Sequence, residues 1–463
     1  MKISFHGADR GVTGSCHLVE CAGKRILIDC GLYQGSHELT EENSQPFGFD
    51  PADIDYLLLT HAHLDHCGRI PLLVKRGFQG EIITTSATRD LARLVMLDAA
   101  HLQEEEAAYQ MRKAARHGNH RATIQPLYTT LDALDALDLF NRKAVYGRSL
   151  SLGRHARVSF FDAGHILGSA CVLLELAQGG ERRRVLFSGD LGYGGRVILR
   201  DPAHPPAADV VVMETTYGNR RHKQLQPSVG EFYEAINDTF HRGGNVIIPS
   251  FALERSQEIL YFLREGINDG VLPGSIQVFL DSPMAISATE IFRRHMECLN
   301  PQGCDLFCAG RDPLNFRGLH FTRETAESMA INRIGGGAVI IAGSGMCTGG
   351  RVRHHLKHNL WRADCSVVFV GYAASGTLAR RIVDGAKKVN IFGEEIPVNA
   401  RVYTIGGFSA HADCEQLYAW HAKTGNPHTT YLVHGEEDVM QAFAKRLTHT
   451  DVVMPKLHAE FPL

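Results

Sequence analysis

The sequence predicts an α/β protein of two domains, one of which is inserted into the other. Short apolar runs that end in His or Asp recur near both ends of the 463-residue chain. Between them, near-continuous apolar runs alternate with helical segments, which is typical of a parallel sheet covered on both faces. A Pro-rich connection at 200–208 marks the first boundary. We therefore expect an outer domain at 1–208 and 396–463, with an inserted domain at 209–395.

Composition fits a soluble globular protein, since 44% of residues are apolar. The net charge of −3 is less basic than is usual for a protein that wraps duplex DNA, so any contact with nucleic acid must be local. No apolar run approaches the roughly 18 residues needed to span a membrane, and the N-terminus lacks the apolar core of a signal peptide. The eleven cysteines show no paired framework, so we expect reduced thiols and a cytoplasmic location.

The first part of the outer domain has the pattern of a sheet with tight turns. Its expected strands are residues 2–6, 15–20, 25–29, 57–59 and 81–85. A short helix is expected at 70–77 and a long one from about 87 to 115. The charged positions of the long helix are expected to be solvated. They include Glu104, Glu105, Glu106, Arg112, Lys113 and Arg116.

Four potential metal ligands follow the expected strand at 57–59, in the stretch His61-Ala62-His63-Leu64-Asp65-His66. Imidazole and carboxylate together suit zinc, or less selectively manganese, iron or nickel. His61 and His63 can converge on one ion, while Asp65 and His66 can reach a second ion, as in two-metal hydrolases. A solvated loop rich in histidine is the alternative. It is disfavoured because a polar cluster directly after a core strand is costly unless it binds something.

Further potential ligands stand where other apolar strands end. His165 and Asp190 each follow such a run, and His411 and His434 follow short strand-like runs near the C-terminus. Asp29 ends the expected strand at 25–29, where it is either a turn-forming residue or a carboxylate that orients the metal loop by hydrogen bonds. Strand ends that all carry ligand types indicate one shared pocket.

The expected insertion has strands at 210–213, 245–249, 277–280, 338–342 and 366–370. Two turns of small residues stand between such strands and helices, where backbone N–H groups and a helix N-terminus favour an anion. Beside a hydrolytic metal site they predict a phosphate-binding track, although single turns of this kind are usually ordinary connections. The candidates are Ser344, Gly345, Ser375, Gly376, Arg351 and Arg380. His354 and His358 could form a separate metal pair, but a surface or RNA-contact role is favoured.

This ordered set of motifs resembles the metallo-β-lactamase superfamily, and specifically its β-CASP nuclease branch. That branch includes the catalytic subunit of the eukaryotic pre-mRNA 3′-cleavage machinery and ribonuclease J. The similarity runs from about residue 2 to the end. Asp29 matches the first superfamily motif, His61–His66 the second, and His165 and Asp190 the third and fourth. Glu214, His411 and His434 match the three motifs particular to the branch.

The resemblance implies an αββα sandwich interrupted by an α/β β-CASP domain with a mainly parallel sheet, and an active site in the cleft between them. It also implies two zinc ions, with manganese as a substitute. The implied ligands are His61, His63 and His165 for one ion, Asp65, His66 and His434 for the other, and Asp190 as the bridge. His411 is then the general acid, with Glu214 to orient it, and Asp65 helps to position the nucleophile.

The function so implied is that of a zinc-dependent ribonuclease acting on single-stranded RNA in processing or decay. It would cut as an endonuclease, and 5′-exonuclease activity is left open. A DNA-directed nuclease is the nearest alternative, but DNA-acting members tend to carry Val where this chain has His434. Small-molecule hydrolases of the superfamily lack an insertion of this length, and inactive RNA-binding partners have typically lost metal ligands. The short chain resembles the compact bacterial form, and a homodimer is left open because no stretch identifies an interface.

Overall fold

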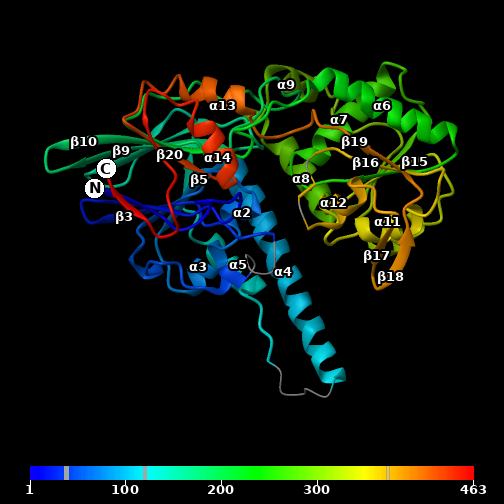
Figure 1. Ribbon diagram of the computed structural model, residues 1–463, viewed down its shortest axis with the longest axis horizontal. Helices are drawn as coiled ribbons and strands as arrows, with labels where there is room; N and C mark the ends of the chain where they lie inside the picture. The colour runs from blue at the N-terminus through cyan, green and yellow to red at the C-terminus, as the bar shows by residue number, and fades with distance from the viewer. Residues whose placement is uncertain (36–40, 118–122, 372, 375) are drawn as a thin grey trace. The chain divides into compact units, whose positions relative to one another are not determined.

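The computed structural model describes residues 1–35, 41–117, 123–371, 373–374 and 376–463. It divides into two compact units, which are described separately here (Figure 1). Unit 1 contains Met1–Arg196, Arg200–Arg221 and His411–Leu463, and unit 2 contains Val197–Leu199 and His222–Ala410. None of the helices in the described ranges is both long and apolar enough to cross a membrane.

The first sheet of unit 1 has the strand order β22-β1-β2-β3-β4-β5-β6. Its strands are β1 (Lys2–Phe5), β2 (His17–Cys21), β3 (Lys24–Ile28), β4 (Tyr56–Leu58), β5 (Glu81–Thr85), β6 (Arg142–Ala144) and β22 (Glu460–Pro462). The strands from β22 to β3 pair antiparallel, and those from β3 to β6 pair parallel.

The second sheet of unit 1 has the order β21-β20-β11-β10-β9-β8-β7. Its strands are β7 (Ser149–Ser151), β8 (Ala156–Asp162), β9 (Ala170–Gln178), β10 (Glu181–Phe187), β11 (Val210–Glu214), β20 (Thr429–Val433) and β21 (Asp451–Val453). One continuous apolar core includes Ile3 and Phe5 from the first sheet and Val172 and Phe187 from the second, so the two sheets pack face to face.

Helices cover the outer faces of these two sheets. They are α2 (Leu64–Cys67), α3 (Ile70–Lys75), α4 (Ser86–Arg116), α5 (Thr130–Leu137), α13 (Cys414–His421) and α14 (Glu437–Ala444). Leu417 of α13 and Phe443 of α14 pack against Leu186 and Val211 of the second sheet. In Figure 1, α3, α4 and α5 lie on the side of the first sheet. The predicted αββα sandwich is therefore confirmed.

Unit 2 is built on a six-stranded sheet of order β14-β13-β15-β12-β16-β19, in which every pairing is parallel. Its strands are β12 (Val246–Pro249), β13 (Gln277–Leu280), β14 (Leu319–Phe321), β15 (Ala338–Ala342), β16 (Ser366–Phe369) and β19 (Arg401–Thr404). Its helices are α6 (Leu225–His241), α7 (Arg255–Asn268), α8 (Pro283–Arg294), α9 (Pro301–Cys308), α10 (Thr325–Ile331), α11 (Val352–Asn359) and α12 (Leu378–Val383). A separate hairpin joins β17 (Lys388–Ile391) to β18 (Glu394–Pro397).

Two strands lie in a different unit from the one the sequence suggested. The run at 210–213 was expected to open the insertion, but β11 lies between β10 and β20 in the second sheet of unit 1. The run at 401–404 was expected in the outer domain, but β19 pairs with β16 in the parallel sheet of unit 2. β11 is a buried apolar run of a kind that either sheet could contain, whereas β19 is a short, partly exposed edge strand, so the sequence pattern alone assigns neither strand.

Candidate metal centre

The metal-ligand stretch lies where β4 ends and α2 begins, in unit 1. His61 and His63 occupy the connection, and Asp65 and His66 lie in α2. The preceding loop packs closely against it at Gly31, where an added Cβ would lie 1.6 Å from the carbonyl oxygen of Asp65. Only glycine permits this approach, so Gly31 helps to fix the position of the ligand stretch.

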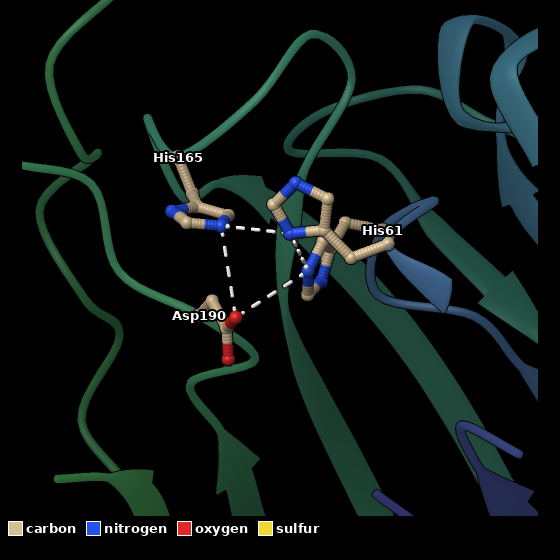
Figure 2. A group of neighbouring side chains, drawn as sticks. His61, His165 and Asp190 are labelled. Atoms are coloured by element: carbon tan, nitrogen blue, oxygen red, sulfur yellow. Dashed lines mark hydrogen bonds and ion pairs between the residues drawn. The ribbon is translucent and has the colours of Figure 1, made fainter. Parts of the chain in front are cut away.

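Four side chains form a first group of ligand atoms, all within 4.8 Å of one another: His61, His63, His165 and Asp190. The Nδ1 atom of His63 lies 3.1 Å from Nε2 of His61 and 3.2 Å from Nε2 of His165. Asp190 Oδ2 lies 3.5 Å from the His61 nitrogen and 3.6 Å from the His165 nitrogen (Figure 2). Ligands around tetrahedral zinc stand about 3.3 Å apart, given zinc–nitrogen bonds of about 2.0 Å. These distances therefore fit one zinc-sized ion.

Asp65, His66 and His434 form a second group within the same limit. Nε2 of His434 lies 3.3 Å from Nε2 of His66 and 3.5 Å from Oδ2 of Asp65. Asp190 also reaches this group, because its Oδ1 lies 3.3 Å from Nε2 of His66. That Oδ1 atom is buried and accepts no hydrogen bond from the described residues. Ring nitrogens of His66 and His434 lie 3.3 and 3.6 Å from this oxygen, so either a protonated imidazole or a cation between the two groups can balance its charge.

Asp29 orients two of the histidines from behind. Its Oδ2 accepts hydrogen bonds from Nδ1 of His66 at 2.7 Å and from the hydroxyl of Thr60 at 2.8 Å, and its Oδ1 accepts from the backbone N–H of Thr60. The Thr60 oxygen in turn lies 3.0 Å from Nδ1 of His61. Both rings therefore hold their protons on Nδ1 and present Nε2 to the cluster, as metal ligands require.

His434 follows β20 in a left-handed backbone conformation, with φ of 50°. Its N–H donates to the carbonyl of Ala8, and its Nδ1 lies 3.1 Å from the hydroxyl of Thr216. That hydroxyl donates to the His434 carbonyl, so it accepts from the ring. The next residue is Gly435, where a Cβ would lie 2.2 Å from Oγ1 of Thr215. These contacts turn Nε2 of His434 toward Asp65 and His66.

Burial sets the protonation of the first group. It lowers the pKa of His61 to about 4 and that of His63 to about 3, and it also holds the pKa of His165 well below its usual range. Asp190 keeps a lowered pKa, because the neighbouring histidines outweigh the cost of its burial. Three neutral imidazoles and one carboxylate are the forms that bind metal, so this group needs no loss of protons at neutral pH.

The second group differs at His66. Burial lowers the pKa of this ring, but the Asp190 and Asp29 carboxylates outweigh that effect and raise it well above the usual range. Asp65 has a lowered pKa, since His434 and His66 outweigh its burial. Without a metal, His66 therefore carries a proton on Nε2 that a cation at this position would displace.

His411 lies beside the two groups, where residue 411 forms a β-bridge with Gly192. Its Nδ1 atom lies 3.3 Å from Oε1 of Glu214 and 3.9 Å from Oδ2 of Asp190. Burial by itself lowers the pKa of His411, but Glu214 and then Asp190 raise it to about 9. The Glu214 carboxylate is held at the end of β11 by the N–H of Leu191, 2.6 Å away. This pair supplies a half-buried, protonated imidazole next to the ligands.

The phosphate-binding candidates all belong to unit 2, and Ser375 lies outside the described residues. Ser344 and Gly345 lie in the loop between β15 and α11, and the hydroxyl of Ser344 bonds within that loop to Gly349. Gly376 is exposed, in the loop before α12. The two loops are adjacent, because the N–H of Ala379 donates to the carbonyl of Met346. The structure thus brings the two turns together.

The two arginine candidates have partners within unit 2. Nη1 of Arg351 donates to the buried Oδ1 of Asp281 at 2.8 Å, and Nη2 donates to the carbonyl of Arg323. Its guanidinium therefore connects the segments that follow β13 and β14, and it is not directed at a phosphate as expected. Arg380 forms a two-point ion pair with Asp384 one turn along α12, and its side chain remains 42% exposed. Over the described ranges, His354 and His358 join no cluster of three potential ligands.

Thr60 and Thr216 were not assigned roles from the sequence, although each fixes the ring of a histidine in the cluster. Thr60 directly precedes His61, and a hydroxyl next to a ligand histidine is a signal that could have indicated it. Thr216 lies far from His434 in the sequence, so only the pairing of β11 with β20 reveals its role.

Comparisons with known proteins now bear on this site. Residues 9–143 match the model of the metallo-beta-lactamase superfamily, residues 256–382 the Beta-Casp domain, and residues 395–455 the Zn-dependent metallo-hydrolase RNA specificity domain. Ribonuclease TTHA0252 of Thermus thermophilus is 40% identical over 96% of this chain and 96% of its own length. The chain belongs to the β-CASP branch of the metallo-β-lactamase superfamily. The predicted family is thereby confirmed. Its models include a Zn-dependent metallo-hydrolase domain, and the His/Asp cluster is the candidate metal-binding site of this chain.

Other proteins similar to this chain carry different names. Transcription termination factor FttA of Methanocaldococcus jannaschii is 31% identical over 96% of this chain and 68% of its own length. An RNase J-like protein of the same organism is 29% identical over 97% and 96%. A protein of unknown function from Enterococcus faecalis V583 has a crystal structure that matches the whole chain with a TM-score of 0.55 and 12% identity, over 99% of its length. That likeness supports the fold alone.

Proposed function

We propose that this chain is a metal-dependent ribonuclease that hydrolyses phosphodiester bonds of single-stranded RNA. The observation that carries the proposal is Asp190, whose two oxygens face two different ligand groups. A bridging carboxylate of this kind is the arrangement used for paired ions in phosphodiester hydrolysis. The likeness to a protein named ribonuclease along the whole chain, together with the RNA specificity domain, supports RNA as the polymer.

The proposed ligands divide between two zinc ions, with manganese as a substitute. His61, His63 and His165 would hold the first ion, Asp65, His66 and His434 the second, and Asp190 would bridge them. Nitrogen and carboxylate donors at these separations fit zinc, and the two oxygens of Asp190 each lie within 3.6 Å of ring nitrogens from a different group. When bound, paired ions of this kind activate a water molecule and stabilise the negative charge that builds up on the phosphate.

The protein's own residues perform the remaining tasks. Asp29, Thr60 and Thr216 keep the ring nitrogens of their histidines aimed at the ions. Asp65 is placed to orient the attacking water. His411 holds a proton near the ligands, and Glu214 keeps it there, so His411 can donate that proton to the leaving oxygen. The loops at Ser344–Gly345 and Gly376 are the proposed contacts for backbone phosphates.

The decisive experiment is cleavage of matched single-stranded RNA and DNA oligonucleotides, labelled at the 5′ or the 3′ end, with metal content measured on the same sample. We expect RNA to be cut by a protein that holds about two zinc ions per chain. Asp65→Asn should abolish cutting, whereas Asp384→Asn, at the exposed ion pair of α12, should not change it. The product ladder separates internal cutting from removal of 5′ nucleotides.

Two rival functions give different outcomes in the same assay. Preferential cutting of DNA would indicate a DNA-directed nuclease, which the presence of His434 disfavours. Failure of a fully metallated sample to cut either polymer would favour a small-molecule hydrolase with the same metal centre. If Asp65→Asn leaves the metal content unchanged, the assignment of Asp65 as a ligand is wrong. If the metal content falls but the natural chain cuts neither polymer, the proposed substrate is wrong.

A further inference from the structure

The C-terminal half of α4 is largely exposed in the part of the chain that the structure describes, although Glu104 near its start accepts hydrogen bonds from Thr130. α4 runs for 31 residues, and its last buried residue is Ala107. Figure 1 shows this half extending away from the sheets of unit 1. Three large apolar side chains on it are exposed, namely Leu102 by 56%, Tyr109 by 52% and Met111 by 40%. Isolated helical turns of this kind are marginal in water unless they pack against something.

In this half of α4, acidic residues precede Tyr109 and basic residues follow it at matching spacings. Glu105 and Glu106 precede that residue by four and three positions, and Arg112 and Lys113 follow it by three and four. If two copies of the helix cross in antiparallel orientation at Tyr109, Glu105 of one copy faces Lys113 of the other and Glu106 faces Arg112. A two-fold axis repeats each pairing, so the surface is complementary to itself.

Among the described residues, the acidic side chains of this pattern contact only neighbours on the same helix. Glu105 lies 3.5 Å from His101, and Glu106 accepts a hydrogen bond from Gln110 on the same helix. Throughout the part of the chain that the structure describes, Arg112 and Lys113 form no ion pair. The basic half of the pattern is therefore available to an acidic partner of matching spacing.

We propose that the segment of α4 from Leu102 to Arg116 is a dimerisation surface, whose partner is the same segment of a second copy of this chain. Tyr109 of each copy packs at the centre, and the charge pairs flank it. The segment is ~22 Å long at the rise of an α-helix. A contact of that length lies at the low end of specific interfaces, so the dimer is weak and salt-sensitive.

Charge reversal tests this pairing. Sedimentation velocity of the full chain over a range of concentrations at low salt should show a monomer–dimer equilibrium. E105K/E106K and R112E/K113E should each weaken dimerisation by about a hundredfold, because every pair becomes a like-charge contact. Mixing these two variants should restore dimers, since all the facing pairs are then opposite in charge. E175K/E181K makes the same change of charge on the exposed β9–β10 hairpin and should leave dimerisation unchanged.

Three outcomes would overturn the proposal. The natural chain could stay monomeric at every concentration, which would make this half of α4 a solvated helix. Dimers could persist in both charge-reversed variants, which would place the interface elsewhere. Finally, R112E/K113E could weaken RNA binding by a chain that is always monomeric, which would make the helix an RNA contact. RNA cleavage by each variant should stay at the natural level, so a failure here is separable from a failure of the proposed nuclease activity.

Discussion

Nδ1 of His411 lies 3.3 Å from Oε1 of Glu214, although the two residues are 197 positions apart in the sequence. β11 pairs with β10, and the loop after β10 contains both Leu191, whose N–H donates to Glu214, and Gly192, which bridges to residue 411. Glu214 is buried at 1% exposure and stabilises the protonated form of the ring. The geometry thus places a proton donor beside the metal ligands, and this donor is not itself one of the proposed ligands.

His411→Ala should therefore keep the metal content and lose most of the RNA cleavage. General acid catalysis is typically worth 10²–10⁴-fold, so we expect a fall in kcat of about that size. Glu214→Gln, which preserves the acceptor for the N–H of Leu191, should give a smaller fall. The measurement is single-turnover cleavage with metal analysis on the same protein. Cutting at the natural rate by His411→Ala would rule out its role as the acid.

Asp29→Asn should weaken metal binding without changing any proposed ligand. An amide nitrogen cannot accept the hydrogen bonds that Oδ2 receives from His66 and from the hydroxyl of Thr60. Loss of such an orienting carboxylate typically costs 10–100-fold in metal affinity. Competition with a chelator measures the change. Asp55→Asn is the control, because Asp55 accepts from Arg25 and Lys24 far from the cluster, and equal losses in both variants would point to general destabilisation.

Much of the fold could be predicted from the sequence, because short apolar runs followed directly by His or Asp mark the strands and their ends. The expected strand at 81–85 coincides with β5, and the long helix expected at 87–115 differs from α4 by one residue at each end. The spacing from His61 to His66 indicated a shared site because these four potential ligands lie within six positions of one another in the sequence.

Other features depend on contacts between distant residues, which no local pattern records. Arg351 follows a glycine turn as a phosphate ligand would, but its guanidinium bonds to Asp281, which lies 70 positions earlier. Thr216 could not be connected to His434 before the strands were paired. Likewise, neither the apolar run of β11 nor the short, partly exposed β19 shows in its own residues which sheet it joins, and only the hydrogen-bond registers assign them.

Asp281→Asn should destabilise unit 2 while leaving the metal centre unchanged. Asp281 is fully buried and accepts hydrogen bonds from His355, Ser328, Thr322 and Arg351. These contacts outweigh its burial and hold its pKa at about 2. Removal of one partner of a buried ion pair typically costs about 3 kcal/mol. Calorimetry should show one lowered transition, with metal content as before. Asp384→Asn, at an exposed pair, should shift it by less than about 0.5 kcal/mol.

Proton binding by Asp162 should make the free energy of unfolding of unit 1 decrease as the pH rises from about 4 to 7. One of its oxygens accepts from the N–H of Gly164, but Oδ2 is buried and has no hydrogen-bond partner among the described residues. Burial raises its pKa to about 7, so between pH 4 and 7 the folded chain binds a proton that the unfolded chain has released. Under these conditions stability decreases with pH, and the decrease ends above pH 7.

Asp162→Asn removes this charge and keeps the acceptor for Gly164. The Tm of the variant minus that of the natural chain should therefore grow between pH 4 and 7 and stay constant above pH 7. At pH 8 the free energy of unfolding of the variant should exceed that of the natural chain by about 2–4 kcal/mol. Scans at fixed metal loading make the comparison. Asp135→Asn, at an exposed position of α5, should give a difference that does not depend on pH. A flat profile for Asp162→Asn would mean that the buried carboxyl stays ionised across this range, held by Arg200 and the Gly164 amide.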